Sequence, residues 1–177
     1  MVSIQHYRDE LGIPDEYGSR PVLPEYVEAP ELVAVGPNII GRMQQLSPDT
    51  ARAWSDMQAA ATRDGLELLL VSGFRSIADQ ALLISRKLNA GQTIEDILRI
   101  NTAPGYSQHH TGRAIDIATP GVRPLTEAFA ESAAFTWLQE HAAQYGFTLP
   151  YTADNQWGIS YEPWHWYLNQ GLTDATD

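Results

Sequence analysis

The strongest constraint on the fold comes from two short segments that lie far apart in the chain but carry the parts of one metal site. The first contains His109 and Asp116, and the second begins with Glu162 and ends with His165. A catalytic zinc ion takes three protein ligands and leaves one position for water, and a nearby group must accept the proton of that water. Two imidazoles and one carboxylate supply the ligands, and a second carboxylate supplies the base. The sequence therefore predicts an enzyme whose fold brings both segments to one cavity.

Composition narrows the chemistry of such a site. The chain has no cysteine, which excludes disulfides, thiolate-bound zinc and thiol nucleophiles. A net charge of -11 disfavours nucleic acid and anionic membrane surfaces as partners, and no apolar run is long enough to span a bilayer. A length of 177 residues suits one domain with its own core, and we expect a monomer.

The chain divides into two parts. Proline and glycine punctuate residues 1–46, which we expect to form an irregular arm that wraps a single catalytic domain over residues 47–177. The first residues lack the basic start and apolar stretch of a secretory signal. The sequence therefore leaves the compartment open between the cytoplasm and, for a chain whose signal has been removed, the cell envelope.

Periodicity and turn residues predict the elements of the domain. Helices are expected over 47–65, 76–91, 93–99 and 126–145, and strands over 67–71, 113–117, 147–149 and 157–167. Helices followed by short strands favour an α+β fold over a regular βαβ series. On the second helix we expect Leu82, Leu83 and Leu88 to face the core.

The second metal segment needs an irregular backbone. Glu162 and His165 are three residues apart, so a regular strand would direct them to opposite faces. Pro163 lies between them and interrupts strand hydrogen bonding. We expect a bend that lets both side chains reach one cavity, walled by aromatic residues, namely Trp164, Trp166 and Tyr167. His110, next to a predicted ligand, is expected either behind the ligands, in a supporting position, or at the rim of that cavity.

Three segments of the chain carry a family pattern. Residues 104–116 contain Pro-Gly-Tyr-Ser-x-His-x-x-Gly-x-Ala-x-Asp, residues 162–165 are Glu-Pro-Trp-His, and residues 72–80 contain Ser-Gly-Phe-Arg-Ser-x-x-x-Gln. In this order they strongly resemble the zinc D-alanyl-D-alanine carboxypeptidases of the VanY type. That family belongs to a wider group with lysostaphin-like peptidases and the Hedgehog signalling domain. The resemblance implies an α+β fold in which helices pack on a small antiparallel sheet.

The resemblance also implies a role for each residue of the pattern. Zinc would be bound by three ligands, His109, Asp116 and His165. Glu162 would be the general base, and Arg75 would stabilise the developing oxyanion. The terminal carboxylate of the substrate would be held by Ser107 and Gln80.

The function implied by the resemblance is removal of the C-terminal residue of peptidoglycan stem peptides, which would place the protein in the cell envelope. Three alternatives stay open: an L,D-carboxypeptidase, a peptidoglycan endopeptidase, and a zinc-stabilised binding module without turnover, because the Hedgehog domain uses this scaffold for recognition. Relatives often carry an arginine soon after the last histidine. Trp166, Tyr167 and Leu168 stand there in this chain, so its pocket floor is expected to differ.

Overall fold

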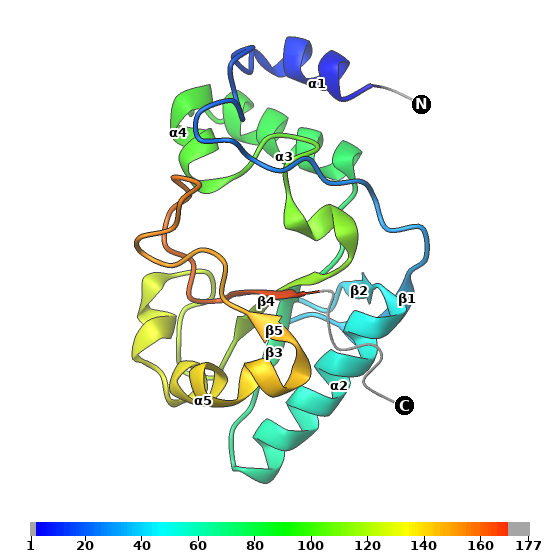
Figure 1. The fold of residues 1–177 in the computed structure, drawn as a ribbon, viewed down its shortest axis with the longest axis vertical. Helices are drawn as coiled ribbons and strands as arrows, with labels where there is room; N and C mark the ends of the chain where they lie inside the picture. Colours follow the sequence, from blue (N-terminus) through cyan, green and yellow to red (C-terminus); the bar gives the residue numbers. More distant parts are fainter. Residues whose placement is uncertain (1–2, 170–177) are drawn as a thin grey trace, which may run out of the picture.

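The computed structural model describes residues 3–169, and its centre is a small four-stranded antiparallel sheet (Figure 1). The strand order is β3-β4-β6-β5, with bounds Leu69–Ser72, Ala114–Ala118, His165–Leu168 and Phe147–Thr148. A separate hairpin pairs β1 (Val33–Pro37) with β2 (Met43–Leu46). The helices are α1 (Ile4–Leu11), α2 (Pro48–Arg63), α3 (Ile77–Asn89), α4 (Ile94–Ile100) and α5 (Ala133–His141). The expected α+β class, with helices packed on a small antiparallel sheet, is confirmed.

Strand register explains how the two distant metal segments meet. β4 is buried along its whole length and lies between β3 and β6. Antiparallel pairing sets Asp116 of β4 opposite His165 of β6, and Ser72 of β3 opposite Asp116. Directly opposed residues have their Cβ atoms about 5 Å apart. The sheet therefore places two predicted ligands side by side although 49 positions separate them in sequence.

Two hydrophobic cores flank the sheet region. The larger lies between the sheet, α2 and α5 and includes Met57, Leu138 and Phe147, all inaccessible to solvent. The smaller lies between α1, α3 and α4 and includes Leu11, Ile84 and Ile97. In Figure 1, α1, α3 and α4 lie on one side of the sheet and α2 and α5 on the other. Each fully buried aliphatic or aromatic side chain stabilises the fold by roughly 1.5–3 kcal/mol.

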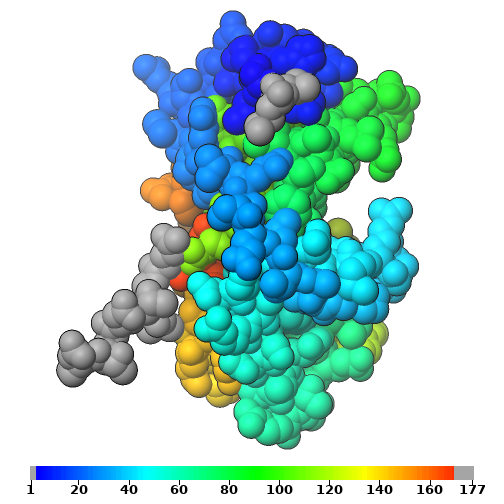
Figure 2. Space-filling model, turned by 90° about the vertical axis from the view of Figure 1, so that its right-hand side faces the viewer, coloured from blue at the N-terminus to red at the C-terminus, as the bar shows by residue number. Residues whose placement is uncertain are grey.

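The N-terminal region is more ordered than the expected irregular arm. Residues 1–46 contain α1 and the β1–β2 hairpin. Ser3 caps α1 by accepting a hydrogen bond from the His6 amide, and Gly12 ends the helix in the left-handed conformation. Figure 2 shows residues 3–46, in blue to cyan, covering one end of the molecule and continuing down its side to the hairpin. The division of the chain at residue 46 stays a prediction.

Three local expectations were wrong. The helix expected over 126–145 is interrupted: 3-10 turns at Glu127–Glu131 and Ala142–Tyr145 flank α5, because Ser132 restarts the helix as a new N-cap. The last strand begins only at His165, because residues 158–162 have no regular structure and a turn follows at Pro163 and Trp164. Leu82 is 47% exposed, and Gln80, Ala81 and Ile84 form the buried face of α3 instead.

Within residues 3–169, no helix combines the length and the apolar character that crossing a membrane requires.

Candidate metal centre and catalytic pocket

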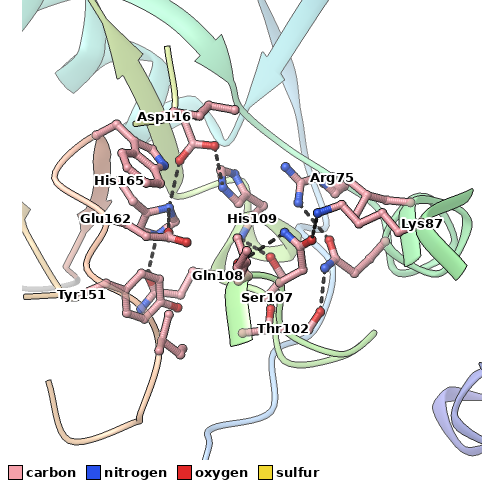
Figure 3. Close-up of a pocket in the computed structure, with 17 residues that line it drawn as sticks. Arg75, Lys87, Thr102, Ser107, Gln108, His109, Asp116, Tyr151, Glu162 and His165 are labelled. Carbon is pink, nitrogen blue, oxygen red and sulfur yellow. Dashed lines mark hydrogen bonds and ion pairs between the residues drawn. The ribbon is translucent and has the colours of Figure 1, made fainter. Parts of the chain in front are cut away.

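The structure brings the three predicted metal ligands together. His109 lies in a 3-10 turn (Gln108–Thr111), Asp116 on β4 and His165 on β6. Asp116 lies between the two rings: its Oδ2 is 3.3 Å from Nε2 of His109, and its Oδ1 is 3.0 Å from Nδ1 of His165. One ligand atom from each residue lies within 4.8 Å of the others, and all three side chains are buried. Two nitrogens and one carboxylate oxygen with this spacing can face a single ion (Figure 3).

The surroundings of His109 direct one ring nitrogen toward the centre. Its Nδ1 lies 2.7 Å from the backbone oxygen of Gly73. A carbonyl can only accept, so Nδ1 carries the ring proton and the Nε2 lone pair faces Asp116. Gly73 is required there, because a Cβ at this position would lie 2.7 Å from the backbone oxygen of Gln45.

Ionisation states at the centre also fit a zinc ion. Burial lowers the pKa of His109 and favours the neutral ring that binds metals. Burial alone would raise the pKa of Asp116, but the neighbouring His109 and His165 hold it well below its usual range. A charged carboxylate beside two imidazoles is a donor set that zinc takes, so the residues present fit this metal.

Glu162 lies beside the ligands and has a perturbed acidity. Its Oε2 is 3.9 Å from Nδ1 of His165, and its side chain is almost fully buried. Burial raises the pKa of Glu162 to about 7; His165 and Arg75 oppose the rise and Asp116 adds to it. A carboxyl group that titrates near neutral pH is suited to accept and return a proton. The bend expected around Pro163 is present, since the His165 amide donates to the Glu162 carbonyl across a turn.

One pocket of about 400 Å³ contains all of these residues. The ligands and Glu162 lie at one side, and Arg75 and Lys87 lie across from them (Figure 3). Arg75 donates to Gln80 Oε1 at 2.9 Å and to Ser72 Oγ at 3.1 Å, and Lys87 donates to Asn101. Burial and nearby Arg75 lower the pKa of Lys87. Within residues 3–169 neither cation forms an ion pair with an acidic side chain, so this side of the pocket favours an anion.

Gln80 and Ser107 line the same pocket but already have protein partners. Gln80 is 1% exposed and donates to the backbone oxygen of Thr102 at 2.6 Å while accepting from Arg75. The Ser107 hydroxyl accepts from the His109 amide at 3.3 Å. Gln80 therefore holds the Arg75 guanidinium in place, and the predicted contact of both residues with a substrate carboxylate stays a prediction.

Sequence reasoning missed three residues of the pocket. Lys87 enters it from α3, the Tyr151 ring packs on His165 with centroids 4.8 Å apart, and Gln108 accepts from His165 at 2.9 Å. Gln108 occupies a variable position of the matched pattern, beside His109. This position next to a predicted ligand was the only feature of the sequence that could have indicated its role. Lys87 lies seven residues after Gln80, two helical turns along α3, and that spacing could have revealed it.

The expected aromatic wall is only partly correct. Trp164 lines the pocket. Trp166 belongs to the larger core and Tyr167 lines a separate groove with Arg113, because both follow His165 into the regular strand β6. His110 is inaccessible to solvent and bonds through its ring to the Arg75 carbonyl and the Gly105 amide. Of the two expected positions it therefore takes the supporting one behind the ligands, where it stabilises the loop, and not the rim.

Comparison with known proteins matches most of the chain to one family. The family model described as VanY, D-alanyl-D-alanine carboxypeptidase, matches residues 43–170. The bifunctional D-Ala-D-Ala dipeptidase and D-Ala-D-Ala carboxypeptidase VanXYC of Enterococcus gallinarum is 34% identical over 129 residues, covering 68% of this chain and 65% of the relative. The curated relatives are longer proteins, and the chain spans between 36% and 65% of their length.

Solved structures share the fold. The LdcB LD-carboxypeptidase, whose structure concerns peptidoglycan recognition, superposes with a TM-score of 0.71 at 31% identity, covering 82% of this chain and 72% of that chain. A variant of the vancomycin resistance D,D-pentapeptidase VanY, solved in complex with Zn(II), superposes with a TM-score of 0.61 at 24% identity and covers 83% of each chain. At that identity the second likeness supports the fold alone.

Proposed function

Because this chain belongs to the VanY family of D-alanyl-D-alanine carboxypeptidases, we propose that it is a zinc metallopeptidase that removes the C-terminal D-alanine of peptidoglycan stem peptides. The observation that carries the proposal is the joint geometry of one pocket. Three buried ligand atoms lie within 4.8 Å of one another, beside a glutamate whose pKa is raised to about 7. A structural metal site would need neither that glutamate nor the arginine across the pocket.

The chain's own groups divide the chemistry between them. Zinc held by His109, Asp116 and His165 would supply Lewis acidity and lower the pKa of an attacking water toward 7. The Glu162 carboxylate takes the proton from that water and returns it to the leaving amine, which a pKa near neutrality allows in both directions. The Arg75 guanidinium, fixed by Gln80 and Ser72, stabilises the negative charge that develops on the carbonyl oxygen.

The cationic side of the pocket supports exopeptidase action. A carboxypeptidase must recognise the free carboxylate of its substrate next to the bond it cuts. We assign this recognition to Ser107 and to the Lys87 ammonium, which has no acidic partner in the described part of the chain. Gln80 contributes indirectly, because it holds the Arg75 guanidinium in the pocket. All of these residues come from one chain, so we propose that a monomer suffices.

The test is D-alanine release from a stem pentapeptide that ends in D-Ala-D-Ala, measured with and without a chelator. The proposal predicts release by the zinc-loaded protein, loss after chelation and recovery when zinc is added back. The control peptide carries a C-terminal amide, which removes the carboxylate and leaves the scissile bond unchanged. No release from protein with bound zinc would refute this substrate.

An L,D-carboxypeptidase acting on tetrapeptides is the second candidate, because the LdcB LD-carboxypeptidase shares this fold at 31% identity. A panel of pentapeptide, tetrapeptide and cross-linked stem peptides, read by mass spectrometry, distinguishes the two activities and tests endopeptidase action as well. A binding module without turnover predicts tight peptide binding and no cleavage, with Glu162→Ala unchanged in both respects.

A further inference from the structure

We propose that Gln108 is a positioning residue for the metal ligand His165, and that Tyr26 of the N-terminal region holds Gln108 in the required orientation. The inference builds on the proposed zinc centre. It assigns a contribution to that centre to a residue that precedes position 43, where the family match begins.

The two ring nitrogens of His165 face different surroundings. Nδ1 lies 3.0 Å from Asp116 Oδ1 and 3.9 Å from Glu162 Oε2. Nε2 lies 2.9 Å from Gln108 Oε1. A cation is attracted to the side that carries the two carboxyl groups, so Nδ1 is the ligand atom. A ring that gives its Nδ1 lone pair to a cation carries its proton on Nε2. That proton is then donated to Gln108.

The orientation of the Gln108 amide follows from the same contact. Gln108 is 5% exposed, so both ends of its amide need partners. The carbonyl end must face the Nε2 proton of His165, because the reversed amide would set two donors against each other. The NH₂ end then faces the Tyr26 hydroxyl, with Nε2 3.3 Å from the phenol oxygen. Each of the two hydrogen bonds, from His165 to Gln108 and from Gln108 to Tyr26, therefore has one donor and one acceptor.

Tyr26 is itself fixed to the loop that carries the ligand His109. Its backbone amide donates to the Gly105 carbonyl at 2.7 Å, and burial raises the pKa of its phenol, which stays protonated at neutral pH. Three residues further on, Ala29 donates to the His110 carbonyl. Residues 26–29 therefore lie along the loop that carries His109. The Tyr26 side chain in this segment acts on the ligand His165 through Gln108.

Partners that orient a ligating histidine typically contribute 10- to 100-fold to metal affinity. The experiment measures the zinc dissociation constant by competition with a chromophoric chelator. We expect Gln108→Leu, which removes the acceptor, to weaken zinc binding about 10–100-fold. Gln108→Glu keeps an acceptor oxygen at the same reach and restores most of the affinity. Wild-type affinity in Gln108→Leu overturns the proposal.

A matched pair of tyrosine variants tests the role of Tyr26. Tyr26→Phe removes the hydroxyl that accepts from Gln108 and is expected to weaken zinc binding. Tyr17→Phe removes another N-terminal hydroxyl, which accepts from the Ala103 amide at 3.2 Å and does not touch Gln108. It is expected to bind zinc as the wild type does, even if its melting temperature falls. Equal zinc affinities for the two variants would overturn the role of Tyr26.

A spectroscopic readout separates positioning from general loss of structure. In the zinc-loaded, 15N-labelled protein, the Nε2 proton of His165 should give a slowly exchanging signal in the wild type and Gln108→Glu. It should be lost in Gln108→Leu. A signal that persists in Gln108→Leu contradicts the proposal. Weakened zinc binding in Gln108→Leu supports it even if no peptide is cut, whereas a wild type that binds no zinc overturns both this inference and the proposed activity.

Discussion

Replacing the proposed base by its uncharged isostere, Glu162→Gln, should slow turnover strongly and also stabilise the metal-free protein at pH values near and above 7. The second effect follows from the electrostatics of the pocket. Glu162 is 9% exposed, and burial raises its pKa from 4.5 to about 7. The folded state therefore favours the protonated carboxyl. Ionising Glu162 in the pocket lowers the free energy of unfolding, because the same ionisation in the unfolded chain carries no burial penalty. A glutamine at this position never ionises.

The magnitude and sign can be worked out from that pKa. A folded-state pKa above the unfolded value gives stability that is fully present below about pH 4.5 and is lost as the pH rises through about 7. Each pKa unit corresponds to about 1.36 kcal/mol, so the wild type loses about 3 kcal/mol between these limits. For a chain of this length that corresponds to about 6–12 °C in melting temperature. Glu162→Gln should lack this loss.

The assay is thermal unfolding of both proteins after chelator treatment, followed by circular dichroism between pH 4.5 and 8. The difference in melting temperature, variant minus wild type, should grow by about 6–12 °C over this range. Glu67→Gln, at an exposed position, is the control and should show no such growth. In the zinc-loaded protein, Glu162→Gln should lower kcat about 10²–10⁴-fold. A difference in melting temperature that does not change with pH would refute the reasoning.

Further predictions concern the proposed ligand Asp116, the cationic side of the pocket and Gly112 in the loop that carries His109. Asp116→Asn should lose bound zinc, measured by atomic absorption, together with activity, because an uncharged amide replaces the carboxylate between the two rings. Lys87→Met should raise KM about tenfold for peptides with a free terminal carboxylate and change kcat little. Arg86→Met, exposed on the same helix, is the control and should leave both constants unchanged. Gly112→Ala should cost about 2–3 kcal/mol in urea unfolding, because φ is +64° and the added Cβ would lie 2.8 Å from the backbone nitrogen of Ser47.

The grouping of His109, Asp116 and His165 at one site was predictable from sequence because the chemistry and order of these residues are restrictive. Two histidines and an aspartate in fixed pattern positions indicated a site before any fold was known, and antiparallel pairing of β4 with β6 then placed Asp116 opposite His165. The starts of two helices followed local signals equally well, whereas the helix expected over 126–145 did not. Ser76 and Thr93 cap α3 and α4 through their hydroxyls, as their place before apolar periodic segments indicated.

The features that could not be predicted from the sequence depend on contacts between residues that are distant in the chain. Gln108 is one ordinary amide among many, and only its position 2.9 Å from His165 shows its use. Leu82 satisfies the helical spacing of a core residue, yet the face of α3 that packs is decided by where α1 and α4 lie. Residues 1–46 contain many turn formers, and tertiary packing of Leu11 and Ile13 overrides that local signal.

All of the described residues that line the pocket lie within the family match, but its position between the two cores lets the N-terminal region influence it from outside. Asp116 and His165 lie on strands that belong to the larger core, whereas Gln80 lies on α3, which packs against α1 in the smaller core. The distance between the metal ligands and the cationic side of the pocket is therefore set by two separately packed units and the loop that joins them. That loop carries His109, and hydrogen bonds to the backbone of the N-terminal region, at Tyr26 and Ala29, hold it. The N-terminal region thus completes one core and holds the loop, so we expect the proposed zinc centre to depend on it although none of the three proposed ligands comes from it.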